Sequence, residues 1–157
     1  MLGANPLADA RRQSRRTAHQ EAGHAVTAFV LGAAVGSATI AASDNYAGRC
    51  WIDDQLSDAP AAIMISFGDV EAEKKCCADR SIDDERAASR RHDLADIRRI
   101  AATAGLDHRE VADLQTEARK LIFDHWSAVH ALALELRFRT TLDGRSIERV
   151  ISNAINY

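Results

Sequence analysis

The sequence is poor in the residues that cross-link or interrupt a small protein. Only three cysteines and two prolines occur among 157 residues, and aromatic side chains make up 5% of the chain. Cys50 stands alone and Cys76 and Cys77 are adjacent, which is not the framework of a disulfide-rich secreted domain. We therefore expect a reducing compartment, and the cytoplasm is the predicted location.

A strong excess of one charge is also missing, and so is a long run of large apolar side chains. The net charge is −3, which does not indicate nucleic acid or an acidic surface as a partner. No signal peptide is visible at the polar, arginine-bearing start. Residues 25–43 carry no charge, but they are rich in alanine and contain Gly32 and Gly36. We interpret this segment as a helix end, a glycine break and a strand, and expect no membrane span.

Helical periodicity dominates the rest of the chain, so we expect a single domain, 1–157, that is mainly α with a small β-sheet (α+β). Asn5-Pro6 predicts a helix start and Gly32 a stop. Asp107 and Glu110 have the spacing of a capping box. The expected strands are 37–42 and 48–52. The expected helices are 5–31, 58–77, 94–105, a long pattern of one or two helices over 107–136, and 146–155.

The first of these helices contains the sequence Q-E-A-G-H. Residues four apart share a helix face, so Gln20 and His24 lie together with Glu21 beside them. In H-E-x-x-H, two histidines at this spacing bind zinc and the glutamate takes a proton from the metal-bound water. Here Gln20 stands at the first histidine position. His19 is five residues from His24 and points well around the helix, so we expect it to be exposed or to support the site indirectly.

The surrounding sequence resembles the peptidase domain of the FtsH-type ATP-dependent zinc metalloproteases. "TAHQEAGHAVTAFVLG" is similar to that family's active-site helix and "VGSATI" to the strand that follows it. "RHDLADIRRIA" resembles the segment whose aspartate is the third zinc ligand, and "EARKLIFDHWSAVHALALELRFRTTLDGRSI" resembles the closing helices. The resemblance implies a zincin-like helical fold with Glu21 as catalytic base, His24 and Asp93 as metal ligands, and Gln20 in place of the first ligand.

The departures from the family pattern limit what the resemblance implies. A neutral amide oxygen at Gln20 is a poorer zinc ligand than imidazole, so we expect zinc to bind weakly or not at all. The family's ATPase module and membrane anchor have no counterpart in these 157 residues. A separately encoded ATPase is therefore an expected partner, and a homo-oligomer is a further expectation from the family's ring assembly.

Gly48 and Trp51 are the predicted substrate-binding residues. They lie on an expected edge strand, and family members hold an extended polypeptide along such a strand by main-chain pairing. The alternative for Trp51 is a place in the core. Cys76 and Cys77 could bind a metal or respond to oxidants, but consecutive thiols on a helix point in different directions, which favours packing.

Three functions remain open at this point, and whether the protein is an enzyme depends on which is correct. The first is a zinc metallopeptidase-like domain with an impaired metal site. The second is a catalytically silent pseudopeptidase that binds peptides or helps assembly. The third is a nucleic-acid-associated role for the basic arm around Arg11-Arg12 and Arg15-Arg16, which we disfavour because few aromatic residues are available for stacking.

Overall fold

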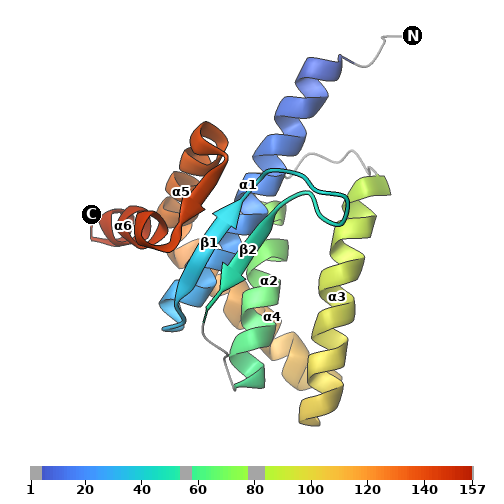
Figure 1. Ribbon diagram of the computed structural model, residues 1–157. Helices are drawn as coiled ribbons and strands as arrows, with labels where there is room; N and C mark the ends of the chain where they lie inside the picture. The colour runs from blue at the N-terminus through green and yellow to red at the C-terminus, as the bar shows by residue number, and fades with distance from the viewer. Residues whose placement is uncertain (1–4, 54–57, 78–83, 157) are drawn as a thin grey trace.

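The computed structural model describes residues 5–53, 58–77 and 84–156, with side chains in these ranges except for 84–93. It is mainly helical with one small antiparallel sheet, which confirms the predicted α+β class (Figure 1). The elements are α1 (Pro6–Val30), β1 (Val35–Thr39), β2 (Arg49–Ile52), α2 (Ala59–Cys76), α3 (Asp84–Ala104), α4 (His108–Asp124), α5 (Trp126–Arg139), β3 (Thr141–Asp143) and α6 (Gly144–Ile155).

Local capping sets the helix ends as the sequence predicts. The Asn5 side chain accepts a hydrogen bond from the Leu7 amide, and proline occupies the first turn of α1. Asp107 and Glu110 form the expected capping box at the start of α4. The long helical pattern that follows is two helices, which meet at His125.

The sheet has the strand order β2-β1-β3, so β1 is central and β2 lies at an edge. Both pairings are antiparallel. The register between β1 and β2 shifts between Val35 and Ser37, which lets β1 begin before the predicted strand at 37. Thr39 ends β1 earlier than predicted, and the third strand, β3, was not predicted at all.

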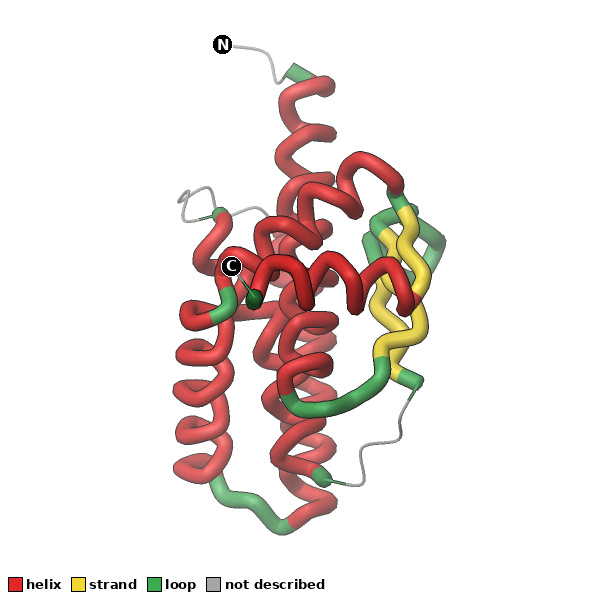
Figure 2. The backbone as a smooth tube through the Cα atoms, turned by 90° about the vertical axis from the view of Figure 1, so that its left-hand side faces the viewer, coloured by secondary structure: helices red, strands yellow, loops and turns green. Residues whose placement is uncertain are grey.

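α2 and α5 pack against α1, and α3 packs on α2 (Figure 1). The sheet lies along one side of the helices (Figure 2). One apolar cluster joins α1, the sheet, α5 and α6, and it includes Val26, Leu136 and Ile147. A second cluster joins α2, α3 and α4 around Phe67 and Ile97. Because α2 contributes side chains to both clusters, it connects the two parts of the core.

Two glycines bring α1 and α2 into backbone contact. A Cβ atom added at Gly23 would overlap the carbonyl oxygen of Gly68 and lie 2.7 Å from the Cβ of Ala72. A Cβ added at Gly68 would overlap the hydroxyl of Thr27 and lie 2.8 Å from the carbonyl oxygen of Gly23. Glycine is therefore required on both sides of this crossing.

Across the residues that the structure describes, no helix combines the length and the apolar character needed to cross a membrane. The uncharged segment 25–43 is divided between the end of α1, a turn and β1, as the sequence predicts.

Candidate functional site

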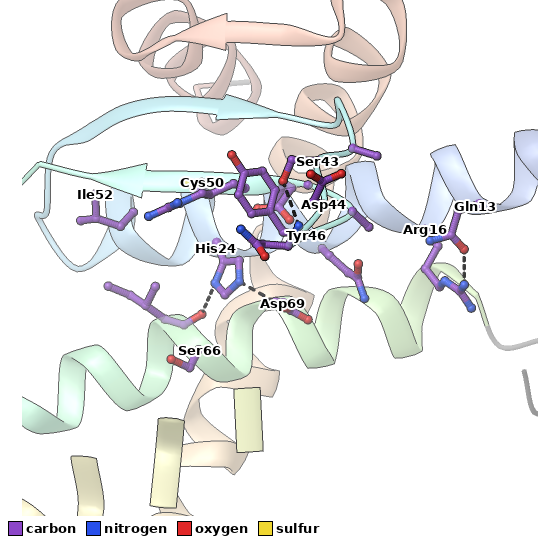
Figure 3. Close-up of a pocket in the computed structure, with 18 residues that line it drawn as sticks. Gln13, Arg16, His24, Ser43, Asp44, Tyr46, Cys50, Ile52, Ser66 and Asp69 are labelled. Carbon is purple, nitrogen blue, oxygen red and sulfur yellow. Dashed lines mark hydrogen bonds and ion pairs between the residues drawn. The ribbon is translucent and has the colours of Figure 1, made fainter. Parts of the chain in front are cut away.

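The three motif residues of α1 lie together beside the close crossing with α2. Gln20 and Glu21 are buried, and the His24 side chain is one-fifth exposed. They line a cavity of about 900 Å³ between α1, α2 and the segment that leads into β2. Figure 3 shows His24 pointing towards α2, with Tyr46 on the opposite side of the cavity. The helical spacing therefore brings the predicted group together.

His24 is held by two oxygen atoms from α2. The carbonyl oxygen of Ile65 lies 2.9 Å from Nδ1, and because a carbonyl only accepts, Nδ1 carries the proton. The other nitrogen, Nε2, lies 3.1 Å from Oδ2 of Asp69. A proton shared by these two atoms, or a metal ion bound to both, accounts for the contact; with the proton on Nε2, His24 is a cation paired with Asp69.

Asp69 is a site residue that sequence reasoning missed. Its carboxylate is 7% exposed and forms an ion pair with His24 when the imidazole is protonated. The adjacent residue, Gly68, makes the close backbone contact with Gly23, which directly precedes His24 in the chain. A local signal for Asp69 was an acidic residue inside the apolar part of the predicted helix 58–77.

Glu21 is a buried carboxyl group that keeps its proton to a higher pH than an exposed glutamate does. Burial raises its pKa from the usual value near 4.5 to about 7, while His24 acts to lower it and Asp69 to raise it. The backbone at Gly48 approaches closely, because a Cβ there would lie 3.0 Å from Oε1 of Glu21 and 2.5 Å from Cγ2 of Thr17. Glu21 can exchange a proton near neutral pH in a site that Gly48 helps to close.

Gln20 turns its amide towards a second buried carboxylate on α2. Its Nε2 donates a hydrogen bond of 2.8 Å to Oε2 of Glu73, whose side chain is fully buried. Glu73 is another residue that sequence reasoning missed. A carboxylate in this position would accept equally well from a histidine ring N–H, which is how ligand histidines are oriented in zinc sites.

The predicted substrate-binding residues have different positions. Gly48 lines the cavity, as does Tyr46. Trp51 is not among the lining residues; its ring packs edge-on against Tyr46 with centroids 6.5 Å apart, and the Arg49 guanidinium lies over both rings. Trp51 therefore supports the rim of the cavity through Tyr46.

Asp93 and His92 fall within α3, in the part where only the backbone is described, so the predicted third ligand lies outside the described side chains. His19 is fully described, and the expectation that it is exposed is wrong. It is buried on another face of α1, where it stacks on Trp126 at 5.6 Å and approaches His130. Burial also lowers the pKa of His19, so it is a neutral packing residue.

The donor atoms fit two positions of a zinc site. Nε2 of His24 and Oδ2 of Asp69 are 3.1 Å apart, close to the ~3.3 Å between two ligand atoms on one tetrahedral zinc with bonds of about 2.0–2.1 Å. Among the described side chains, no group of three His, Cys, Asp or Glu residues could hold a metal ion. A catalytic zinc takes three protein ligands, so Gln20 or Asp93 would have to supply the third.

Three arginines of the basic arm have contacts within the protein. Arg12 pairs with Asp9 of the same helix, and Arg15 donates to the carbonyl oxygen of Cys76 in α2. Arg16 donates to the side chain of Gln13, and both line the cavity. Arg11, Arg12 and Arg15 are exposed, so a nucleic-acid role of this arm stays a prediction.

A comparison with known proteins gives no match to a protein-family model and none to a curated sequence.

Proposed function

We propose that the protein is a metallopeptidase-like domain that binds an extended polypeptide in the cavity beside β2 and hydrolyses peptide bonds slowly. The observation that carries this proposal is the convergence of Glu21, His24 and Asp69 in one cavity next to an edge strand. The resemblance of the α1 sequence to the FtsH-type active-site helix supports the same assignment.

Glu21 is the proposed general base. A buried carboxylate whose pKa is about 7 can take a proton from the attacking water and return it to the leaving amine. His24 and Asp69 would hold a metal ion, with Gln20 or Asp93 as the third ligand. When bound, zinc supplies a Lewis acid that polarises the scissile carbonyl. Replacement of one imidazole by an amide weakens metal binding, which is why we expect slow hydrolysis.

The proposed substrate is a polypeptide in extended form. β2 is an edge strand of the sheet, and the segment from Ala42 to Cys50 that leads into it lines the cavity. An extended chain that pairs with β2 through its main chain would run past Glu21 and His24. Main-chain pairing depends more on the conformation of the bound chain than on its sequence. We therefore expect unfolded segments to bind in preference to folded proteins.

A catalytically silent peptide-binding domain is the second candidate, and the Gln20 contact favours it. The amide of Gln20 donates to Glu73 in a buried pair, so this side chain already has a structural role. A site in which only His24 and Asp69 supply strong donors could lose metal while the groove keeps its shape. Peptide binding would then survive without hydrolysis.

The family resemblance also supports a separately encoded ATPase that delivers unfolded chains, and a homo-oligomeric assembly, as proposals. The three cysteines are thiols in this structure, which supports a reducing compartment such as the cytoplasm.

The deciding experiment measures metal content and cleavage on the same preparation. Protein dialysed against zinc and then against metal-free buffer is assayed by elemental analysis and with fluorescently labelled, unfolded casein. Retained zinc and cleavage that chelator abolishes would support the peptidase. Glu21→Gln is the matched control, because it should keep the metal and lose the cleavage.

Absence of cleavage from protein with verified zinc would rule out the peptidase. If casein then still binds without metal, the silent peptide-binding domain is the correct function. If it neither binds nor is cleaved, both candidates fail.

A further inference from the structure

Two cysteines at the end of α2 form a second chemical group away from the cavity. In a regular helix, consecutive side chains point about 100° apart, which is why the sequence predicts separate packing of Cys76 and Cys77. That prediction is wrong. Cys76 is the last helical residue, and Cys77 leaves the helix with φ −123° and ψ 58°. The turn of the backbone brings the two Sγ atoms to 2.7 Å from each other.

The surroundings of the pair combine access with positive charge. Both thiols are partly exposed. Arg15 of α1 donates a hydrogen bond of 3.1 Å to the carbonyl oxygen of Cys76, and its charge acts to lower the pKa of that thiol. Nearby cations favour the thiolate, which is the reactive form of cysteine.

The two thiols act on each other. The hydrogen bond with Cys77 raises the pKa of Cys76, burial and charge repulsion from Cys77 raise it further, and Arg15 acts in the opposite direction. When one thiol of the pair reacts, the other sulfur therefore lies within 2.7 Å of it.

We propose that Cys76 and Cys77 are a redox modification site that closes into a disulfide between adjacent residues by exchange with a small-molecule disulfide of the glutathione type. One thiolate of the pair attacks one sulfur of the small disulfide and releases one small thiolate. The neighbouring cysteine then loses its proton, attacks the Sγ atom that carries the adduct and releases the second small thiolate. The two protein thiols are oxidised, the small disulfide is reduced to two thiols, and the two protons pass to the released thiolates.

The resulting bond is readily reversible. Consecutive Cα atoms lie about 3.8 Å apart across a trans peptide, which is shorter than the ~4.4–6.8 Å that an unstrained disulfide spans. Strained and exposed disulfides are more easily reduced than structural ones, so the site would respond to the ratio of small disulfide to small thiol. No residue of the cavity takes part, so this inference does not depend on the proposed function.

The test uses the full chain and oxidised glutathione. After incubation, thiols are blocked with N-ethylmaleimide in denaturant and the protein is digested with trypsin. Cleavage after Lys75 and Arg80 yields the peptide 76–80, which contains both cysteines, whereas Cys50 lies in the separate peptide 50–74 and serves as an internal reference.

We expect peptide 76–80 to lose two hydrogen atoms, to carry no maleimide and to recover both thiols in dithiothreitol, while Cys50 stays alkylated. In the variant Cys76→Ser, glutathione should remain attached at Cys77, because the second thiol is missing. If the wild-type peptide 76–80 carried two N-ethylmaleimide groups, both thiols would have stayed reduced, and the inference would be wrong. A persistent glutathione adduct on the wild type, or a disulfide between two chains, would also overturn it.

Discussion

Glu21 shows how one buried side chain makes stability depend on pH. Its pKa rises to about 7 in the folded protein from a usual value near 4.5. Between these values the folded state binds more protons at Glu21 than the unfolded state does. Stability from this group is therefore greatest at low pH and is lost as the pH rises through about 7.

We predict that Glu21→Gln stabilises the metal-free protein at pH 8 and has much less effect at pH 5. The difference should reach up to about 3 kcal/mol, the cost of ionising the buried carboxyl. Urea unfolding of both proteins at the two pH values, with chelator present, measures it. An equal effect at both values would show that Glu21 is not shielded from water.

In the proposed metal site Gln20 is the weakest donor, so a histidine at position 20 should raise the affinity for zinc. We predict that Gln20→His raises the affinity for zinc by at least 10–100-fold, since a ligand contributes at least as much as its supporting contacts. Competition with a chromophoric chelator measures the change.

The matched control for this variant is Gln20→His combined with Glu73→Gln. Glu73 is fully buried within hydrogen-bond distance of the Gln20 amide, and it should orient the new imidazole. We expect the double variant to lose part of the zinc affinity that Gln20→His alone gains. A single variant that binds zinc no better than the wild type would show that position 20 does not face the metal.

The missed residues share a physical cause. Glu21 and His24 could be placed from helical spacing, because residues of one helix lie at fixed angles. Asp69 and Glu73 have meaning only opposite α1, and that contact depends on how two helices cross. Local periodicity contains no information about a partner so distant in the sequence.

At the scale of elements, the crossing of α1 and α2 gives the most specific prediction. Glycine to alanine in an exposed helix usually stabilises by about 0.5–1 kcal/mol. We predict the opposite sign for Gly23→Ala and Gly68→Ala, with a loss of roughly 1–3 kcal/mol, because the added methyl forces the backbones apart. Thermal and urea unfolding measure the effect.

The reverse change, Ala112→Gly on the exposed face of α4, is the control for helix propensity and should cost about 1 kcal/mol. If the crossing variants were as stable as the wild type, α1 and α2 would not be in backbone contact.

Sequence signals worked best for elements with chemical markers at their ends. Asn5 and Asp107 are side-chain caps, and both helix starts were predicted from them. β3 has only three residues with Leu142 alone buried, too few for an alternating pattern. The break at His125 has no glycine or proline beside it, so the sequence left one helix and two equally possible.

At the scale of the whole molecule, α2 should make the protein unfold as one unit. Ile65 of α2 packs in the first cluster and Phe67 in the second, so neither cluster is complete without this helix. Ile97→Ala removes most of a buried side chain from the second cluster. We predict that it lowers the free energy of unfolding of the whole protein by about 2–5 kcal/mol.

Two spectroscopic signals test this cooperativity. Trp126 packs against the first cluster and Trp51 lies on β2, so tryptophan fluorescence reports on that side. Circular dichroism reports on all helices. In the Ile97→Ala variant the two urea transitions should coincide. A helical signal that is lost before the fluorescence changes would mean that the α2–α3–α4 part unfolds separately.

The contact between Gly23 and Gly68 also links the stability of the fold to the geometry of the site. Each glycine directly precedes a residue of the site, His24 in one case and Asp69 in the other. A change at Gln20 would disturb one buried hydrogen bond to Glu73, whereas a side chain at either glycine would push two helix backbones apart. A substitution at Gly23 or Gly68 should therefore displace His24 or Asp69 and alter the cavity as well as destabilise the fold.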